Sequence, residues 1–339
     1  MTMRDDGRPV LVTGGAGYIG SHVVRRLVAD GRQVVVYDNL STGHAWAVLG
    51  AELVVGDLGD RDRLEALFAD RRFDAVLHIA ASIWVGESVR EPARYYRNNV
   101  VNALGLFELA ARHGVSGIVF SSTAAVYGEP GVPVIEESTP LAPVNPYGAS
   151  KMMAERMLMD IARASGLRYV VLRYFNVAGA DLEGRIGEAT PDNSHLVKVA
   201  CEAAFGVRPG MKINGVDYPT PDGTCVRDYI HVEDLAAAHV EALSYLGRGG
   251  RSEVFNCGYG RGFSVREVID TVVRVSGVAI PVEESARRPG DPPMLVASNA
   301  KIRRMLGWQP RHDDLEFIVQ TAWAWEQKLQ ARLAAAADG

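Results

Sequence analysis

The sequence of 339 residues predicts an α/β protein with a doubly wound parallel sheet and a smaller C-terminal lobe. Up to about residue 175, short β-branched runs alternate with stretches of helical periodicity. This alternation is typical of parallel strands with helices on both faces of the sheet. Beyond residue 176 the chain turns to loops rich in Gly, Pro and Asp with shorter elements. We therefore expect one domain over residues 1–176 and a second lobe over residues 177–339, with the chain free to cross back between them.

The individual elements follow from the periodicity of apolar residues. Strands of the first domain are expected at residues 9–13, 33–37, 52–55, 74–79, 117–121 and 168–173. Helices between them are expected near residues 18–30, 61–69, 91–113 and 147–165. Helices of the second lobe are expected at residues 194–205, 233–246, 264–276 and 312–330. In such a fold, ligands bind at the carboxyl ends of the parallel strands.

A glycine-rich turn directly follows the first expected strand. Gly14, Gly17 and Gly20 have the spacing G-x-x-G-x-x-G, between that strand and an apolar-periodic helix. Glycines at this spacing allow a tight turn, the approach of a pyrophosphate to the backbone, and close packing of helix on strand. The first N–H groups of the helix then face the phosphates without partners. The position of the turn favours a Rossmann-type dinucleotide-binding loop over a plain turn.

The second expected strand ends in a carboxylate, Asp38, 18 residues after Gly20. A carboxylate at this position can accept hydrogen bonds from both ribose hydroxyls of adenosine, and it would repel a 2′-phosphate. The alternative is a solvated side chain at the end of a strand. Together with the glycine turn, Asp38 predicts that residues 1–176 bind NAD rather than NADP.

Tyr147 and Lys151 are four positions apart in an expected helix that begins at Pro146. They therefore lie on one helical face. An ammonium group fixed beside a phenol stabilises the phenolate, so the tyrosine can take a proton near neutral pH. That chemistry suits removal of an alcohol proton while the hydride leaves for a nicotinamide. The alternative is an ordinary amphipathic helix in which a Tyr-x-x-x-Lys spacing occurs by chance.

Composition excludes several other classes of protein. A net charge of −5 without a cluster of Lys and Arg argues against nucleic acid as a partner. The three cysteines lie far apart without C-x-x-C pairs, which argues against a metal site and a disulfide framework and fits a cytoplasmic protein. No apolar run approaches 18 residues, so we expect no membrane span.

Further motifs occur in order along nearly the whole chain: TGGAGYIGS (13–21), VGESV (85–89), SSTAAVYG (121–128), LRYFN (172–176) and DYPTPDGTCVRDYIHV (217–232). In these motifs the chain resembles the extended short-chain dehydrogenase/reductase family, and within it the NAD-dependent sugar-nucleotide 4-epimerases. The resemblance implies transient oxidation of UDP-galactose or UDP-glucose at C4, rotation of the 4-keto sugar, and its reduction on the other face. It also implies that the C-terminal lobe mainly binds the UDP-sugar.

The resemblance implies roles for individual positions. The implied catalytic residues are Tyr147, Lys151 and Thr123. The implied cofactor contacts are Gly14, Gly17, Tyr18, Ile19, Gly20, Asp38, Asn39, Asp57, Leu58, Ala80, Asn98, Ser121, Tyr147, Lys151 and Tyr174. The implied substrate contacts are Thr123, Asn176, His195, Leu196, Arg227, Arg288, Asp291 and Leu295. In this set Arg227 and Arg288 would bind phosphate and Asp291 the uridine ribose, whereas His195 could equally be a local structural residue.

Two alanines distinguish the reaction from related ones. Sugar-nucleotide dehydratases of the superfamily carry Asp-Glu directly after the residue that matches Thr123, and related decarboxylases carry a Glu at the second of those positions. Here the two residues are Ala124 and Ala125, and neither can move a proton. The site can therefore oxidise and reduce C4 but lacks the groups for elimination, which favours epimerisation.

Three positions leave the identity of the sugar-nucleotide substrate open. Ile83 stands where some epimerases place a cation near the cofactor, and Asn214 where an aromatic commonly stacks on uracil. Leu295 matches a pocket gate and is intermediate in size, so we expect good UDP-galactose turnover and weak turnover of N-acetylated sugars. UDP-xylose or UDP-arabinose, a dehydratase or decarboxylase, and a non-catalytic NAD sensor remain alternatives. The resemblance also implies a homodimer through the helices near residues 91–113 and 147–165.

Overall fold

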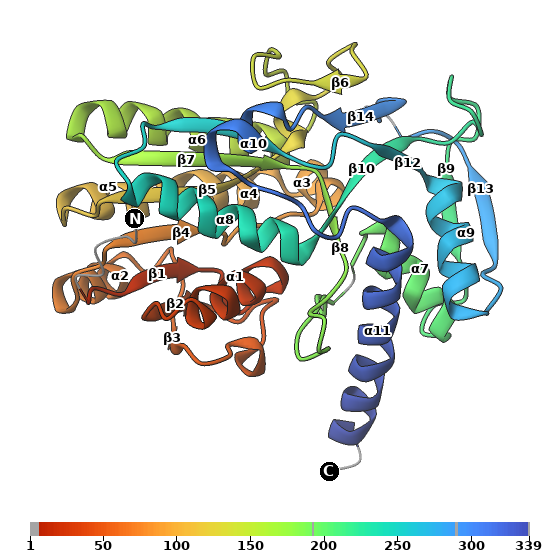
Figure 1. Cartoon of the computed structure of the whole chain (residues 1–339), viewed down its shortest axis with the longest axis horizontal. Coiled ribbons are helices and arrows are strands. Elements are labelled where there is room, and N and C mark those ends of the chain that lie inside the picture. Colours follow the sequence, from red (N-terminus) through yellow and green to blue (C-terminus); the bar gives the residue numbers. More distant parts are fainter. Residues whose placement is uncertain (1–6, 192, 289–290, 338–339) are drawn as a thin grey trace.

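A seven-stranded parallel sheet forms the centre of the computed structural model, which describes residues 7–191, 193–288 and 291–337 (Figure 1). Its strand order is β3-β2-β1-β4-β5-β7-β11, and each pair of neighbours is parallel. The strands are β1 (Val10–Thr13), β2 (Val34–Asp38), β3 (Glu52–Val55), β4 (Ala75–His78), β5 (Gly117–Thr123), β7 (Arg168–Tyr174) and β11 (Glu253–Cys257). The predicted doubly wound fold is confirmed.

All strands predicted for the first domain are present, and one further strand joins them. β11 comes from the C-terminal half of the chain and pairs with β7, with Val254 opposite Val171. Its partner lies about 80 residues away in the sequence, so no local pattern pointed to this pairing. The division of the chain after residue 176 stays a prediction.

Helices cover both faces of the central sheet, as the alternation of elements predicts. One face packs against α1 (Tyr18–Ala29) and α8 (Val232–Gly247), which also contact each other. The other face packs against α2 (Arg61–Asp70), α5 (Asn102–Arg112) and α6 (Pro146–Ser165). The side chains of β1 alternate between the two cores, with Val10 and Val12 on the first side and Leu11 on the second.

The helix predicted near residues 91–113 is confirmed as one unbroken helical run. α4 (Pro92–Tyr96) leads directly into a π-helical turn, η2 (Arg97–Val101), and α5 continues from it, while the separate short helix α3 (Val85–Arg90) precedes the run. Pro92 starts the run, and the wider π-turn is the feature that a regular helical period did not predict. π-turns are frequent at functional sites, and this one carries Asn98 and Asn99.

The C-terminal lobe is built on two small sheets at one end of the central sheet (Figure 1). The first has the order β12-β10-β14-β6, with β8 also paired to β10, and the second pairs β13 with β9. Their strands are β6 (Val134–Ile135), β8 (Asn176–Ala178), β9 (Met211–Asn214), β10 (Val226–His231), β12 (Gly262–Ser264), β13 (Val282–Ser285) and β14 (Met294–Ala297). These short strands were not predicted.

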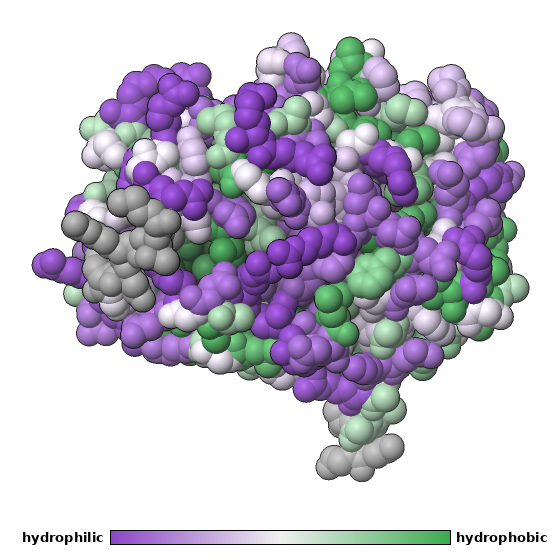
Figure 2. Space-filling model, in the orientation of Figure 1, coloured by the Kyte–Doolittle hydropathy of each residue, from purple (hydrophilic) through white to green (hydrophobic). Residues whose placement is uncertain are grey.

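The helices of this lobe are α7 (Leu196–Phe205), α9 (Val265–Ser276), α10 (Ala300–Leu306) and α11 (Leu315–Ala337), and short 3₁₀ turns are η1 (Ala45–Ala47) and η3 (Ala124–Tyr127). The predicted helices here are confirmed to within a few residues, except that α11 runs further and α10 was not predicted. Figure 2 shows hydrophilic side chains interspersed with smaller hydrophobic patches on one face of the molecule. Among the helices described, none has the length and apolar character to span a membrane.

Candidate active site and cofactor cleft

Two glycines in the turn between β1 and α1, Gly14 and Gly20, are required by close contacts within the chain. Gly14 has a φ of +75°, and its N–H donates to the carbonyl oxygen of Tyr37 at 3.0 Å. A Cβ on Gly14 would lie 2.5 Å from the backbone nitrogen of Ala80. A Cβ on Gly20 would lie 2.0 Å from the carbonyl oxygen of Gly14. The close packing of helix on strand therefore requires both glycines.

Gly17 differs, because its neighbours in the chain do not require a glycine. Its φ is −80°, and the nearest described atom to an added Cβ would be the carbonyl oxygen of Gly14 at 3.4 Å. Gly17 is the N-cap of α1, it lines the cleft described below, and no described side chain caps the helix at this end. The missing side chain keeps open space in front of the free N–H groups of the helix. These features fit a phosphate group of a dinucleotide.

Asp38 is held rigidly at the end of β2. Its two carboxylate oxygens accept the N–H groups of Ala16 at 2.9 Å and of Leu40 at 2.8 Å. Burial raises the pKa of Asp38, and the two backbone hydrogen bonds oppose this rise. Beside it, Asn39 Nδ2 donates to Asp57 Oδ2 at 2.6 Å. Asp38, the predicted adenosine contact, therefore lies beside two further predicted cofactor contacts, Asn39 and Asp57.

A cleft with about 1130 Å³ of empty space, its open mouth included, lies at the carboxyl ends of the strands. Its lining contains most of the predicted cofactor contacts: Gly14, Gly17, Tyr18, Ile19, Gly20, Asp38, Asn39, Asp57, Leu58, Ala80, Asn98 and Tyr174. It also contains His195, which was predicted for the substrate, and the apolar side chains of Ile83 and Trp84. Ser121, Tyr147 and Lys151 stand outside this lining. Tyr174 lies beside the end of β5, since it is opposite Thr123 in the strand register. Burial raises the pKa of Tyr174, and a hydrogen bond with Ser121 opposes this rise.

The start of α6 positions the Tyr147–Lys151 pair. Asn145 caps the helix, its side-chain oxygen accepting the N–H of Gly148 at 2.9 Å, and Pro146 is the first helical residue. Both members of the pair are buried, with Tyr147 8% and Lys151 2% exposed. The predicted placement on one helix is confirmed, and the pair faces the interior rather than solvent.

Lys151 is tied to the end of β5. Its Nζ donates to the carbonyl oxygen of Ser121 at 2.8 Å and lies 4.9 Å from the centre of the Phe120 ring. Burial lowers the pKa of Lys151 to about 7, and the carboxylate of Glu155 opposes this. The hydroxyl of Ser121 is engaged elsewhere, 2.7 Å from Nε2 of His239.

The electrostatics of Tyr147 differ from the sequence-based expectation. Burial raises the pKa of Tyr147, and a hydrogen bond with Thr123 lowers it in part. The expectation that Lys151 brings the phenol toward neutral pH is not met by the chain alone. The reason is that burial penalises the phenolate and also depletes the positive charge on Lys151.

Thr123 ends β5 and presents its hydroxyl next to Tyr147. Its Oγ1 also accepts the N–H of Ala125 at 3.2 Å, which caps the 3₁₀ turn η3. Ala124 and Ala125 therefore occupy the turn directly beside the Tyr147–Thr123 contact, and they offer only methyl groups.

Asn99 is a structural partner of this site that the sequence reading did not single out. Its Oδ1 accepts the N–H of Ser82 at 2.8 Å, and its Nδ2 donates to Ser150 Oγ at 3.0 Å. Ser150 Oγ in turn donates to the carbonyl oxygen of Tyr147 at 2.7 Å. The buried amide thus ties the cleft wall to the helix that carries Tyr147. The adjacent asparagines at 98 and 99 were the only signal, and just the first was assigned a role.

Two of the predicted phosphate and ribose contacts, Arg227 on β10 and Asp291 just before β14, lie together. Arg227 Nη2 lies 3.1 Å from Asp291 Oδ1, and its Nη1 donates to the carbonyl oxygen of Pro292 at 2.8 Å. Leu295 is opposite Arg227 in the strand register. Leu295 also packs into the small core that contains Ala124, so the predicted gate and the catalytic turn share one cluster.

Arg288 is held by Asn214 at the end of β9. With the amide oriented to satisfy its neighbours, Asn214 Oδ1 accepts from Arg288 Nη2 at 3.0 Å and from Arg288 Nε at 3.2 Å. Its Nδ2 donates to Ser285 Oγ at 3.1 Å. Asn214, which stands where an aromatic was expected, therefore orients a predicted phosphate-binding guanidinium. Pro289 and Gly290, which follow Arg288 in the chain, lie outside the described residues.

The other predicted substrate contacts lie at the junction between the lobes. Asn176 begins β8 opposite Tyr229, and Leu196 begins α7. His195 caps α7 and pairs with the carboxylate of Glu188. Burial lowers the pKa of His195, but the charge of Glu188 and its hydrogen bond together outweigh burial, so the net pKa is raised. Among the described residues there is no group of His, Cys, Asp and Glu side chains that could hold a metal ion.

A parallel doubly wound sheet, a glycine turn with free helical N–H groups, and a buried Tyr-Lys pair next to the cleft define a dinucleotide-dependent enzyme that acts on an alcohol. The model of the NAD dependent epimerase/dehydratase family matches residues 10–258. The chain belongs to this family.

Individual relatives are similar over almost the whole chain. The UDP-glucose 4-epimerase of Azospirillum brasilense is 56% identical over 322 residues, which cover 95% of this chain and 92% of the relative. The crystal structure of UDP-glucose 4-epimerase from Brucella ovis in complex with NAD has a TM-score of 0.91 at 47% identity, covering 94% of this chain and 98% of that one. The UDP-Glc/GlcNAc 4-epimerase of Campylobacter jejuni has a TM-score of 0.84 at 47% identity, with coverage of 95% and 100%.

Proposed function

We propose that this chain interconverts UDP-galactose and UDP-glucose by inverting C4 of the sugar, with NAD as its cofactor. The observation that carries the proposal is the buried contact of Tyr147 with Thr123, next to a turn of two alanines. A phenol and a hydroxyl can exchange a proton with an alcohol, whereas two methyl groups cannot assist elimination. The high identity to UDP-glucose 4-epimerases over nearly the whole chain supports the same activity.

The cleft residues fit NAD. Gly17 and the first N–H groups of α1 would face the pyrophosphate, and Asp38 would accept the ribose hydroxyls of adenosine. When bound, NAD supplies a hydride acceptor for C4 and returns the hydride in the second half of the reaction. Asp38 carries a negative charge where NADP would place its 2′-phosphate, which supports NAD as the cofactor.

Tyr147 is proposed to move the proton. Its phenolate would take the proton of the C4 hydroxyl, and the hydroxyl of Thr123 would orient that oxygen. The flat 4-keto sugar would then turn about its link to the nucleotide, so that its other face is presented for reduction at C4. Tyr147 would return the proton to the C4 oxygen. Lys151, fixed to Ser121, would support the phenolate whenever its amine is protonated.

Rotation of the sugar requires a nucleotide that stays in place. Arg227 and Arg288 are each held by neighbours, Arg227 by Asp291 and Arg288 by Asn214. Guanidinium groups held in this way suit bidentate contacts to phosphate oxygens. We therefore assign the diphosphate to these arginines, the uridine ribose to Asp291, and contacts near the junction of the lobes to Asn176, His195 and Leu196.

The nature of the sugar is the finer question. Leu295 lies in the core next to the catalytic turn, and its intermediate size favours UDP-galactose over N-acetylated sugars. The similarity to a UDP-Glc/GlcNAc 4-epimerase and, at 44% identity, to a probable UDP-arabinose 4-epimerase from rice keeps those sugars as the second candidates.

Proton NMR of UDP-galactose tests the proposal. The purified protein, without added cofactor, is expected to convert UDP-galactose into an equilibrium mixture with UDP-glucose. An unchanged spectrum before and after NAD is added would reject this substrate. The same assay with UDP-N-acetylgalactosamine and UDP-arabinose ranks the alternatives, and equal rates on UDP-galactose and UDP-N-acetylgalactosamine would overturn the role of Leu295.

Tyr147→Phe is the matched variant, because it removes only the hydroxyl oxygen from a buried ring. A loss of about 10²- to 10⁴-fold in kcat is expected for removal of a general base. Full activity of the folded variant would exclude Tyr147 as the proton carrier.

We further propose that the chain forms a homodimer in the cytoplasm and serves galactose metabolism. α5 packs against α6, and apolar side chains remain exposed near them, with Val101 60% and Met153 41% exposed. The free, buried cysteines Cys201, Cys225 and Cys257 are compatible with a reducing compartment. Light scattering of wild type and Met153→Arg tests the dimer: a monomeric wild type at micromolar concentration would contradict it.

A further inference from the structure

Two loops from different parts of the chain line the cofactor cleft and form its first rim and its second rim. The segment after β2 contributes Ser41 and Thr42 to the lining, directly beyond the proposed adenosine contact Asp38. The segment before α7 contributes Glu188 and Thr190. Nε2 of His44, from the first rim, lies 3.2 Å from the carbonyl oxygen of Ala189, on the second. The two rims therefore meet beside the cleft.

The first rim is held by the C-terminal helix α11 through Trp46. The indole of Trp46 stacks on the ring of His44 with centroids 5.0 Å apart and lies 5.9 Å from the indole of Trp325. The guanidinium carbon of Arg332 lies 4.1 Å from the centre of the Trp46 ring. Trp46 is thus surrounded by His44 and by two side chains of α11.

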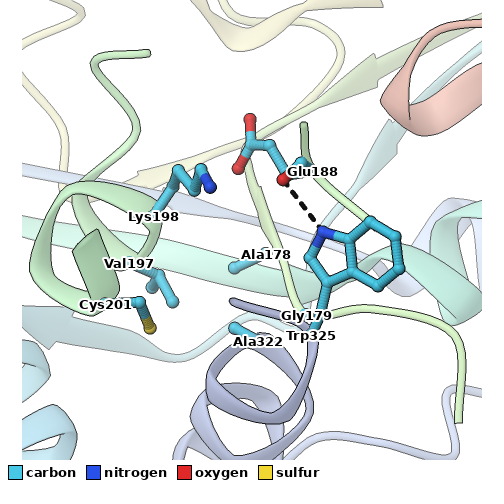
Figure 3. A pocket seen from close by; sticks show the side chains of 8 residues that line it. All are labelled: Ala178, Gly179, Glu188, Val197, Lys198, Cys201, Ala322 and Trp325. Carbon is cyan, nitrogen blue, oxygen red and sulfur yellow. Dashed lines mark hydrogen bonds between the residues drawn. The ribbon is translucent and has the colours of Figure 1, made fainter. Parts of the chain in front are cut away.

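The second rim is held by the same helix through Trp325. Its Nε1 donates to the carbonyl oxygen of Glu188 at 3.0 Å, as Figure 3 shows. A Cβ on Gly187 would lie 2.5 Å from the Trp325 ring, so the loop backbone rests directly on the indole. One helix from the end of the chain therefore joins both rims, and Figure 1 shows α11 beside the loop that precedes α7.

We infer that His44, Trp46, Ala189, Trp325 and Arg332 form a clasp that retains NAD in the cleft between turnovers. The clasp joins the rim next to Asp38 to the rim that carries Glu188 and His195, so it must open when the adenosine end of the cofactor leaves. This inference rests on the proposed function. Epimerisation has no net redox change, so the enzyme has no need to exchange its cofactor, and slow release of NAD does not limit turnover.

The experiment measures NAD release rather than activity. Holoenzyme loaded with labelled NAD is mixed with a large excess of unlabelled NAD, and the label that remains on the protein is followed by rapid desalting. Trp46→Ala removes the ring contacts with His44 and Trp325 and the cation–π contact with Arg332. We therefore expect this variant to lose the label about ten-fold faster than wild type. Arg332→Gln removes the cation alone and should accelerate loss by about three-fold. The kcat per NAD-loaded subunit should stay unchanged, because no clasp residue is assigned to the reacting atoms.

Arg304→Gln is the matched control, since it removes an exposed arginine from α10, outside the clasp. Its rate of NAD loss should equal that of wild type. Wild-type rates in both Trp46→Ala and Arg332→Gln would overturn the clasp, and if Trp46→Ala does not fold, Arg332→Gln decides alone. A wild type that retains labelled NAD but leaves UDP-sugars unchanged would instead overturn the proposed function, while faster release in the variants would still support the clasp.

Discussion

The Nζ atom of Lys151 donates to the carbonyl oxygen of Ser121 at 2.8 Å, and this bond joins helix α6 to strand β5 of the central sheet. Thr123 lies two residues further along the same strand, and Tyr147 lies one helical turn before Lys151. The bond therefore fixes the two elements whose side chains, Tyr147 and Thr123, meet at the proposed reacting atom.

Replacement of Lys151 by Met should change how stability depends on pH in the cofactor-stripped protein. The folded-state pKa of Lys151 is about 7, below the ordinary value of 10.5. Between these values the unfolded chain binds the extra proton, so this group makes the free energy of unfolding increase as pH rises, by at most about 1.4 kcal/mol per pH unit. Thermal unfolding from pH 7 to 10 should show a flatter profile for Lys151→Met. Parallel profiles would contradict the buried, weakly basic amine.

Replacement of Thr123 by Val should slow the reaction and move its pH dependence. The hydrogen bond from Thr123 lowers the pKa of Tyr147, so its loss raises that pKa and shifts the acidic limb of kcat against pH to higher pH. At neutral pH we expect kcat to fall by about 10- to 100-fold, which is typical for one lost hydrogen bond to a charged group. Thr123→Ser keeps the hydroxyl and should behave nearly like wild type. An unshifted limb in Thr123→Val would refute this role.

Replacement of Asn99 by Leu should destabilise the wall of the cleft. The part-buried N–H of Ser82 and the buried hydroxyl of Ser150 would lose their amide partner, at a cost of up to about 1–3 kcal/mol per unsatisfied group. Urea unfolding followed by fluorescence measures the loss. Arg97→Ala, an exposed change in the same π-turn, is the control and should be nearly neutral. Equal stability of the two variants would show that Asn99 does not hold the wall.

Replacement of Asn214 by Leu should weaken the binding of UDP. The guanidinium of Arg288 would lose two hydrogen bonds that orient it, so we expect about ten-fold weaker binding of UDP by calorimetry and a smaller effect on uridine. Lys212→Leu is the control, because Lys212 lies on the same strand as Asn214. It removes an exposed ion pair with Glu283 and leaves Arg288 untouched. Wild-type affinity in Asn214→Leu, or the same loss for uridine as for UDP, would rule out an effect through the phosphates.

Local patterns predicted a large part of this molecule. The strands β1, β2, β3, β4, β5 and β7, the glycine turn and the positions of Asp38, Tyr147 and Lys151 all depend on residues that are close in sequence. Strand and helix periods differ, and a capped helix start is a local signal, so these elements could be predicted. The resemblance in ordered motifs added the expected substrate contacts, several of which, such as Asn176, Arg227 and Leu295, lie on short strands that periodicity did not predict.

Other features depend on residues far apart in the chain. β11 completes the sheet only because it pairs with β7, and Asn99 meets Ser150 across two helices. Trp46 and Arg332 come from opposite ends of the sequence. The burial that raises the pKa of Tyr147 also depends on distant parts of the chain, whereas the sequence indicated only the neighbouring lysine.

The sequence by itself therefore determined the fold class, the glycine turn and the placement of Tyr147 and Lys151 on one helix, since each follows from a local period or spacing. Tertiary structure alone decided which distant side chains meet, how deeply the catalytic pair is buried, and which groups orient the arginines and join the rims of the cleft. The physical reason is that burial and long-range contact set desolvation and hydrogen-bond partners, and neither is a property of a short stretch of chain.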